Sequence, residues 1–323
     1  MIFSIIIPCF NNSRFIEETL ESIRSQTLSD WECLVVDDGS NDTSVEIAKA
    51  FSKLDSRFLV YTRPESLPKG ANSCRNHGAT LARYQHLIFL DADDLLTKEA
   101  LAIRAVALDE ELDLAIFRTG KFTNQPSVHE DFSTQLNVNF GASDYLGQFL
   151  AYQIPWHTSS GMWRKDFFKK IGGFDQELQR FQDVEIHIRA LASPSLRLMV
   201  YPEYPITSLY RKSLYHTQVT LEKRRLILDQ GFVFLDKIKN QFGQEMLGKT
   251  YPFLVYLLFR FEEVFGNSDY QKIMKLYDSF KNDRSVSQSF KMVWWLHTEV
   301  LKRPSKIRKL LSFGIFKCGT FID

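Results

Sequence analysis

The feature that most constrains the fold is a series of short apolar segments that alternates with amphipathic segments through the first 117 residues. Residues 4–9 (SIIIPC) form a continuous, mostly β-branched run, which is typical of a strand buried on both faces. The same patterning predicts further strands at 31–36, 57–61, 86–90 and 112–117, and helices at about 14–26, 43–51, 70–82 and after Thr97. Strands and helices in alternation require crossover connections, so the sequence predicts an α/β fold with a mainly parallel sheet flanked by helices.

Charge divides the chain into two parts, although the total is only +1. Residues 1–216 contain 22 basic and 28 acidic side chains, whereas residues 217–323 contain 18 basic and 11 acidic ones. The near-neutral total argues against general nucleic-acid binding. We expect one domain over 1–216, with halves at about 1–118 and 119–216, followed by an all-helical region over 217–323. The polar stretch 119–142 predicts a long functional loop.

No segment of the sequence predicts a signal peptide or a membrane span. The amino terminus has no basic region ahead of its apolar run, and the apolar stretch 251–259 is far shorter than the ~20 residues that a spanning helix needs. None of the four cysteines forms a CxxC pair, which fits a reducing, cytoplasmic setting. Residues 302–322 carry six basic and no acidic side chains among apolar ones. This segment predicts peripheral contact with an anionic membrane surface, or else a packed helix with a solvated basic face.

Polar segments follow three of the expected strands at their carboxyl ends, where open parallel sheets bind ligands. These segments are 8–12 (PCFNN), 37–40 (DDGS) and 91–94 (DADD). Five carboxylates at one rim favour a hard divalent cation, Mg²⁺ or Mn²⁺, although each pair also suits the capping of a turn or helix. Because the sequence has no glycine-rich phosphate loop after the first strand, phosphate binding would depend on the metal and on basic side chains such as Lys69 and Arg75.

Six ordered motifs across residues 4–185 resemble glycosyltransferase family 2, whose members have the Rossmann-like GT-A fold. The matching segments are SIIIPCFN (4–11), SIRSQT (22–27), VVDDGSND (35–42), RNHGA (75–79), FLDADD (89–94), and IGGFD (171–175) followed by Gln182-Asp183. The resemblance implies an inverting, metal-dependent enzyme that moves a sugar from a nucleotide-sugar donor, with a UDP-sugar expected. It also implies a saccharide or lipid-linked saccharide acceptor in bacterial surface glycan synthesis, with donor binding in 1–118 and acceptor binding in 119–216.

By the same resemblance, Asp38 binds the nucleobase. The DADD segment is expected to bind the metal and the ribose and diphosphate of the donor. Asp91 and Asp93 are the expected ligands, and Asp94 could replace one of them. His216 is a further candidate metal ligand, or else a solvent-facing histidine. The remaining donor contacts expected from the resemblance are Pro8, Phe10, Asn11, Lys69, Arg75 and Ala92.

Asp183 is the expected catalytic base, because an inverting transfer needs a group that accepts the proton of the attacking hydroxyl. It opens an expected helix, and the alternative is an ordinary first-turn acid. Gln182 stands where the family usually has glutamate, which weakens inference about the acceptor. Trp156 and His157 precede a run of hydroxyl side chains and are, with Gln182, the candidates for acceptor binding. The alternative for Trp156 is a buried tryptophan beside a turn.

Two other functions remain open from the sequence. A sugar nucleotidyltransferase has a similar fold, but it expects a GxGxR-type loop after the first strand, which the turn at 8–13 lacks. A non-catalytic nucleotide- or glycan-binding module is the second alternative. Retention of Asp38, Asp91, Asp93 and Asp183 argues against it.

Overall fold

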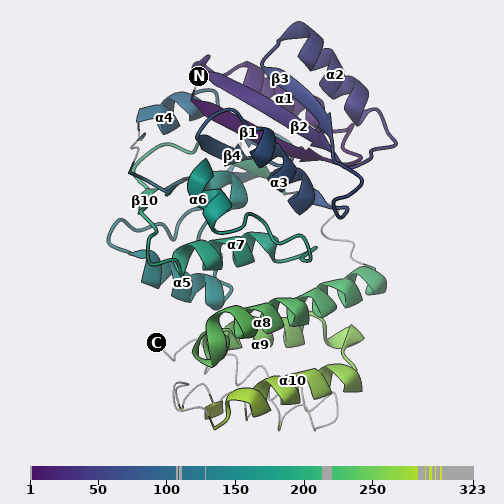
Figure 1. Cartoon of the computed structure of the whole chain (residues 1–323), viewed down its shortest axis with the longest axis vertical. Helices are drawn as coiled ribbons and strands as arrows, with labels where there is room; N and C mark the ends of the chain where they lie inside the picture. Colours follow the sequence, from purple (N-terminus) through teal and green to yellow (C-terminus); the bar gives the residue numbers. More distant parts are fainter. Residues whose placement is uncertain are drawn as a thin grey trace. The chain divides into compact units, whose positions relative to one another are not determined.

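The structure is a computed structural model that describes residues 2–106, 108, 111–127, 129–212 and 220–282, and the single positions 288, 291, 292, 295 and 299. The chain forms two compact units (Figure 1). One comprises Met1–Tyr145 with Ile154–His216, and the other comprises Leu146–Gln153 with Thr217–Asp323. The sequence did not predict that residues 146–153 group with the second unit.

The first unit alternates strands and helices, as the apolar periodicity predicts (Figure 1). Its elements in the first half are β1 (Phe3–Cys9), α1 (Ile16–Arg24), β2 (Trp31–Asp37), α2 (Ser44–Leu54), β3 (Phe58–Thr62), α3 (Ala71–Leu81), β4 (His86–Phe89), β5 (Leu95–Leu96), α4 (Ala100–Val106) and β6 (Leu114–Phe117). The second half contains β7 (Thr119–Phe122), β8 (Glu130–Asp131), the 3₁₀-helix η1 (Thr158–Ser160), β9 (Gly161–Arg164), α6 (Lys165–Lys170), α7 (Gln182–Leu191), β10 (Leu198–Tyr201) and β11 (Ser208–Arg211). Helix α5 (Ala142–Leu150) contains the boundary between the units.

Seven strands form the main sheet, in the order β10-β6-β9-β4-β1-β2-β3. All neighbours are parallel except for the pairs that β9 makes with β4 and β6. The predicted α/β fold with a mainly parallel sheet is therefore confirmed. Because β2 and β3 lie on one side of β1 and β4 lies on the other, the strand order reverses at β1. Such a reversal opens a ligand crevice at the carboxyl ends of the strands.

A second sheet has the order β5-β11-β7-β8. Strands β7 and β8 arise from residues 119–142, where the sequence predicts an irregular loop, so that prediction is wrong in part. The two strands have four and two residues, too few for a period-two pattern to stand out. Phe122 of β7 packs with Leu95 and Leu209 on one face of this sheet.

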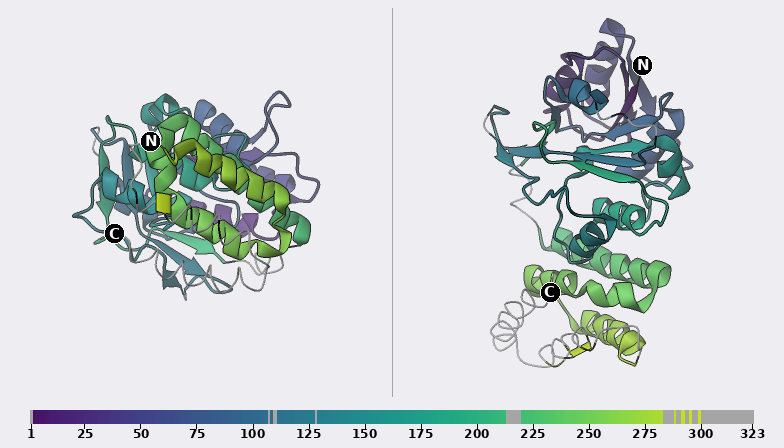
Figure 2. Two further views of the ribbon diagram at one scale, coloured as in Figure 1. Left: turned by 90° about the horizontal axis from the view of Figure 1, so that it is seen from below. Right: turned by 90° about the vertical axis from the view of Figure 1, so that its left-hand side faces the viewer.

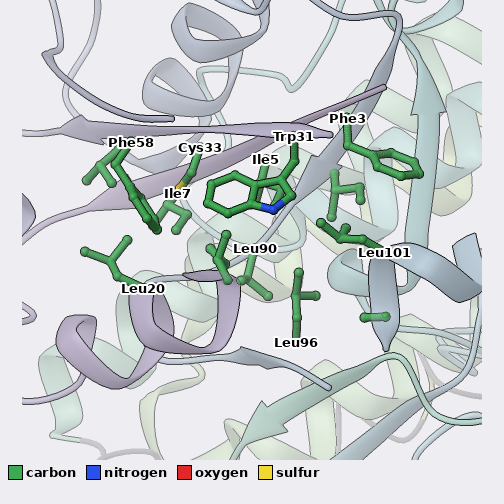
Figure 3. Packing of buried hydrophobic residues seen from close by; sticks show 14 of the residues in the cluster. Phe3, Ile5, Ile7, Leu20, Trp31, Cys33, Phe58, Leu90, Leu96 and Leu101 are labelled. Carbon is green, nitrogen blue, oxygen red and sulfur yellow. The ribbon is translucent and has the colours of Figure 1, made fainter. Parts of the chain in front are cut away.

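Helices cover both faces of β1, whose seven residues are all buried. Figure 3 shows Ile5 and Ile7 of β1 and Trp31 of β2 gathered with Leu20 of α1 in one apolar cluster. On the other face, Gly78 of α3 lies so close that a Cβ added there would be 2.5 Å from Cγ2 of Ile6. Burial of each large apolar side chain contributes about 1.5–3 kcal/mol, so this two-sided packing holds the strand ends in place.

The described part of the second unit consists mainly of helices that pack side by side (Figures 1 and 2). They are α8 (Leu221–Lys249), which is interrupted at Gly243 with φ at +83°, α9 (Tyr251–Arg260), the 3₁₀-helix η3 (Glu262–Val264) and α10 (Asn267–Phe280). The predicted helical region is thus confirmed over 220–282. Tyr152 contacts the rings of Phe253 and Tyr256, which accounts for the grouping of 146–153 with this unit. Among the described residues, no helix is both long enough and apolar enough to cross a bilayer.

Candidate active site

The loops after β1 and β2 are joined by hydrogen bonds at the carboxyl edge of the main sheet. The N–H of Asn11 donates to Oγ of Ser40 over 3.0 Å, and the N–H of Asn41 donates to Oδ1 of Asn11 over 2.8 Å. Asn11 has φ at +49°, a left-handed conformation that asparagine tolerates better than most residues. Pro8 is buried within β1, opposite Val36 of β2. The two loops therefore form one continuous rim.

The adjacent carboxylates of Asp37 and Asp38 have different surroundings. The side chain of Asp37 accepts hydrogen bonds from the N–H groups of Gly39 and Ser40, so it holds the turn, as the capping alternative predicts. Asp38 is only 6% exposed and forms an ion pair with Arg63. Its backbone N–H donates to the carbonyl of Cys9 at the end of β1. Asp38, unlike Asp37, is also one of the residues that line a neighbouring pocket.

A pocket of about 380 Å³ lies beside this rim and is lined by Phe10, Asp38, Lys69, Gly70, Ala71, Asn72, Ser73, Gln176, Leu178, Gln179 and Gln182. The pocket brings together four residues that the sequence analysis names, since Phe10, Asp38, Lys69 and Gln182 all contribute to its wall. Phe10 is 46% exposed, and Nζ of Lys69 lies 4.2 Å from the centre of its ring.

Two polar atoms in the wall of this pocket have no hydrogen-bond partner among the described residues. They are Oγ of Ser73 and Oε1 of Gln182, and both atoms are buried. A buried polar atom without a partner costs about 1–3 kcal/mol. The lining of the pocket thus has an aromatic ring, a cation and a carboxylate, and two of its residues carry unpartnered polar atoms.

Arg75 connects this region to the segment after β4. Its guanidinium is almost buried and forms an ion pair with Asp91, and it also donates to Oδ1 of Asn72 over 3.2 Å. Burial alone would raise the pKa of Asp91, but the charge and hydrogen bond of Arg75, together with His157, outweigh it and leave that pKa below its usual range. Asp91 is consequently an anion at neutral pH.

The DADD segment offers its carboxylates unequally. Asp94 is fully buried: its Oδ1 accepts the N–H of Arg211 over 2.9 Å, whereas Oδ2 has no hydrogen-bond partner among the described residues. Burial and the charges of Asp91 and Asp93 hold the pKa of Asp94 well above its usual range, and burial raises that of Asp93 to about 6. Ala92 has its side chain in the core and its carbonyl bonded by a threonine hydroxyl, which leaves its N–H as its remaining polar group.

His157 joins these carboxylates from the distant segment before β9. Strand β9 pairs antiparallel with β4, with His86 opposite Arg164, so the chain that enters β9 through the 3₁₀-helix η1 arrives from the carboxyl end of β4. Ligand atoms of Asp91, Asp94 and His157 lie within 4.8 Å of one another, with Nδ1 of His157 at 3.8 Å from Oδ2 of Asp94.

The donor set of this group, two carboxylate oxygens and one imidazole nitrogen, is compatible with Mn²⁺ or Mg²⁺. Burial lowers the pKa of His157, which keeps the ring neutral and able to ligate. The buried, unpartnered Oδ2 of Asp94 and the surplus of negative charge also fit a cation. Of the two registers that the DADD segment allows, the geometry brings Asp94 rather than Asp93 into the group. The sequence analysis predicts an acceptor-binding role for His157, whereas the structure brings it next to these carboxyl groups.

Asp183 lies in the first turn of α7, where the N-terminal helix dipole favours a carboxylate. The preceding Phe181 has φ at +63°, which marks a sharp entry into the helix. Nδ1 of His187 lies 2.6 Å from the carbonyl of Asp183, one turn back. The carboxylates of Asp91 and Asp183 oppose the effect of burial on the pKa of His157, so Asp183 lies within electrostatic range of that ring.

The structure contradicts one sequence-based assignment, and another lies outside the described residues. Trp156 is only 1% exposed, with its ring packed against Tyr145 and His187 at centroid distances of 4.8 and 5.5 Å. It has no free face on which an acceptor sugar could stack, so its predicted acceptor role is corrected to a core role. His216 lies outside the described residues, as does the segment 302–322.

The sequence matches the family model for glycosyl transferase family 2 over residues 4–172, more than half of the chain. The chain therefore belongs to glycosyl transferase family 2, and the family expected from the motifs is confirmed.

Curated relatives match only parts of this chain. It is 29% identical over 193 residues to the uncharacterized glycosyltransferase EpsJ of Bacillus subtilis (strain 168), which covers 58% of this chain and 55% of EpsJ. It is also 29% identical over 198 residues to a PGL/p-HBAD biosynthesis glycosyltransferase of Mycobacterium tuberculosis (strain ATCC 25618 / H37Rv), covering 60% of this chain and 71% of that protein. The chain thus spans only about half the length of the relative EpsJ.

Solved structures share the fold over nearly the whole chain. Residues 1–349 of S. aureus TarS in complex with UDP-GlcNAc superpose with a TM-score of 0.64 at 18% identity, covering 98% of this chain and 89% of that one. The mannosyltransferase PcManGT from Pyrobaculum calidifontis, in complex with GDP-Man and Mn²⁺, gives a TM-score of 0.50 at 15% identity over 97% of this chain and 84% of that one. At these identities the comparison concerns the fold alone.

Proposed function

We propose that this chain is an inverting, metal-dependent glycosyltransferase that uses a nucleotide-sugar donor, with a UDP-sugar as the leading candidate. The observation that carries the proposal is the convergence of Asp91, Asp94 and His157 within 4.8 Å, in a family 2 fold and in electrostatic contact with Asp183. The UDP-GlcNAc complex of TarS supports the choice of UDP, and the Mn²⁺ complex of PcManGT supports the metal.

The donor's nucleoside would lie in the pocket between Phe10 and Asp38. An exposed aromatic ring offers a stacking face, and a carboxylate accepts hydrogen bonds from base or ribose groups. Lys69 and Arg75 supply positive charge for the diphosphate. The backbone near Pro8 and Asn11, and the N–H of Ala92, complete the donor contacts that we propose.

Asp91, Asp94 and His157 would hold the divalent cation, with Asp93 and His216 as further candidate ligands. Such a cation supplies the Lewis-acid charge that a departing nucleoside diphosphate requires. Oδ2 of Asp94 has no other partner among the described residues, so ligation would also relieve its desolvation. The ion pair between Arg75 and Asp91 holds the Asp91 carboxylate in its anionic, ligating form.

Asp183 would act as the base. In the proposed step, the acceptor hydroxyl oxygen forms a bond to the anomeric carbon while the bond from that carbon to the diphosphate oxygen breaks, and the hydroxyl proton passes to the Asp183 carboxylate. Attack opposite the leaving group inverts the anomeric configuration. Gln182, next in the chain and in the pocket wall, is positioned to hydrogen-bond a sugar hydroxyl.

The acceptor that we propose is a saccharide or lipid-linked saccharide in surface glycan synthesis, and we propose a cytoplasmic setting. The name of the mycobacterial relative, a PGL/p-HBAD biosynthesis glycosyltransferase, supports a role in glycan synthesis. We propose residues 1–216 as the catalytic domain, with a donor half at about 1–118 and an acceptor half at about 119–216. The region 217–323 would be accessory, with membrane-surface contact through 302–322 as a further proposal.

A thermal-shift screen of nucleotides and nucleotide sugars, with and without Mn²⁺, tests the proposal. A ligand that binds only the native state raises the melting temperature. We expect UDP or a UDP-sugar to raise it in the presence of Mn²⁺, and the Asp38→Asn variant to weaken that effect. If no nucleotide changes the melting temperature of the wild type under either condition, the proposed function is wrong.

A further inference from the structure

A second pocket, of about 370 Å³, opens where β7 and β11 end. We call it the basic pocket; it is lined by Lys121, Phe122, Thr123, Asn124, Gln125, His129, Glu130 and Lys212. It shares no lining residue with the pocket at Phe10 and Asp38. The donor contacts proposed above therefore leave this pocket without a role.

The basic pocket adjoins the Asp91–Asp94–His157 group through two aromatic side chains. Lys121 of β7 pairs with Tyr210 of β11, and the ring of Tyr210 lies 4.6 Å from that of His157. Nζ of Lys121 lies 4.2 Å from the centre of the Phe132 ring, which is itself 6.1 Å from the ring of His157. A molecule that reaches the reacting centre past His157 would therefore meet Lys121.

The approach to the reacting centre on this side is otherwise acidic. The ring of His157, which Tyr210 contacts, has its Nδ1 3.8 Å from Oδ2 of Asp94 and lies in one group with Asp91. Two carboxyl groups therefore lie directly behind the ring that borders this approach. Without compensating positive charge, an anionic molecule would be repelled here.

The basic pocket carries positive charge, whereas the adjacent Asp91–Asp94–His157 group is acidic. Within the described part of the chain, no carboxylate forms an ion pair with Lys121 or Lys212, whereas Arg118, just before β7, is paired with Asp131. Glu130 is the one acid in the lining, directly across from Lys121 in the β7–β8 ladder. Two lysines against one glutamate give the carboxylate and ammonium groups of the lining a net charge of +1.

We propose that the basic pocket binds the acceptor and that the acceptor carries a phosphate or carboxylate group beside its reactive hydroxyl. Lys121 and Lys212 would hold that anionic group, and the amides of Asn124 and Gln125 would bind sugar hydroxyls. Ammonium groups are point charges that suit both anions, since they do not impose the planar geometry of a guanidinium. The proposal rests on the proposed glycosyltransferase function and specifies the class of its acceptor.

Three probes that share one sugar ring test the proposal: glucose 6-phosphate, glucuronate and glucose. Their dissociation constants are measured by ligand-observed NMR on the full chain with saturating UDP and Mg²⁺, which occupies the donor side. We expect both anions to bind the wild type at least about tenfold more tightly than glucose, because a hydrogen bond to a charged group contributes about 1.5 kcal/mol or more. The tighter of the two anions identifies the charged group.

Charge variants of the lining give the second readout. The Lys121→Gln/Lys212→Gln double variant should weaken both anions by about tenfold and leave glucose unchanged. Glu130→Gln should tighten them by about twofold, since it removes the opposing charge. Lys53→Gln, which removes an exposed lysine in the last turn of α2, is the matched control and should change neither.

Equal affinity of the wild type for glucose and the two anions, or no detectable binding of either anion, overturns the proposal. Unchanged anion affinity in the double variant also overturns it, and UDP affinity shows that the variants are folded. Should the double variant fail to fold, Glu130→Gln decides, because no tightening there counts against the basic pocket. A wild type that binds no UDP contradicts the proposed function instead, and anion selectivity is then read without UDP.

Discussion

Replacement of Asp94 by asparagine tests whether this carboxyl group binds a metal or stabilises the fold. The side chain of Asp94 is fully buried, and its Oδ1 accepts the N–H of Arg211 over 2.9 Å. An amide oxygen can accept that bond equally well. The change removes a buried carboxyl group whose ionised form is disfavoured by burial and by Asp91 and Asp93, so the metal-free variant should be as stable as the wild type or more stable.

The expected loss appears when metal is added. For the wild type at a metal concentration 100-fold above its Kd, linkage gives about 2.7 kcal/mol of stabilisation. For a unit of 150–250 residues, each kcal/mol corresponds to about 2–4 °C, so the melting temperature should rise by about 5–10 °C. Asp94→Asn lacks one of three ligands that lie within 4.8 Å of one another, and we expect most of this rise to disappear.

The assay is a thermal melt with UDP, with and without Mn²⁺, of the wild type, Asp94→Asn and a control. Asp166→Asn is the control, because this exposed first-turn acid of α6 lies outside the group and should keep the wild-type rise. A full Mn²⁺-dependent rise in Asp94→Asn would refute the ligand assignment. A metal-free variant that is less stable than the wild type by more than about 2 kcal/mol would refute the view that the Asp94 carboxyl group does not stabilise the metal-free fold.

Three further predictions concern stability and chemistry. Burial lowers the pKa of His187 from 6.5 to about 4, so between these pH values the unfolded chain binds a proton that the native chain does not. The free energy of unfolding should therefore fall by about 3 kcal/mol as the pH drops from 6.5 towards 4. In denaturant titrations at several pH values, His187→Phe should show a weaker dependence of this free energy on pH. Gly78→Ala should cost about 1–3 kcal/mol in the same titrations, because its Cβ would lie 2.5 Å from Ile6, whereas Gly147→Ala in α5, with nothing within 4 Å, should be neutral or stabilising. Asp183→Asn should keep UDP affinity and lose at least about a hundredfold in transfer rate, as measured by UDP release with acceptor.

The strands and the loops after them could be predicted because local patterns determine them. The apolar run at 4–9 and the DADD segment at 91–94 were both readable, since a buried parallel strand and its polar end occur close together in the chain. The pairing of β4 with β9 was not readable in this way. His157 reaches Asp94 only because an antiparallel strand enters the sheet between β4 and β6, a long-range event that leaves no local periodicity.

Other residues show where local chemistry is ambiguous. Trp156 precedes a hydroxyl-rich segment and suited a sugar-binding surface, but its ring packs against Tyr145 and His187. Asp37 and Asp38 are adjacent and chemically identical, and only the backbone of the turn determines that Asp37 holds the loop and Asp38 faces the pocket. The sequence could not decide between Asp93 and Asp94 as a metal ligand for the same reason. The orientation of Asp94 depends on a hydrogen bond from the N–H of Arg211, which is distant in the chain.

The most direct test of the central claim is NMR observation of a UDP-sugar donor during its Mg²⁺-dependent breakdown by the wild type. An inverting enzyme acting on an α-linked donor should release UDP and transfer the sugar, to water or to acceptor, with the β-anomer formed first. Asp183→Asn and Asp94→Asn should both slow this reaction strongly. Initial formation of the α-anomer, or no release of nucleoside diphosphate from any nucleotide sugar with or without metal, would contradict the account.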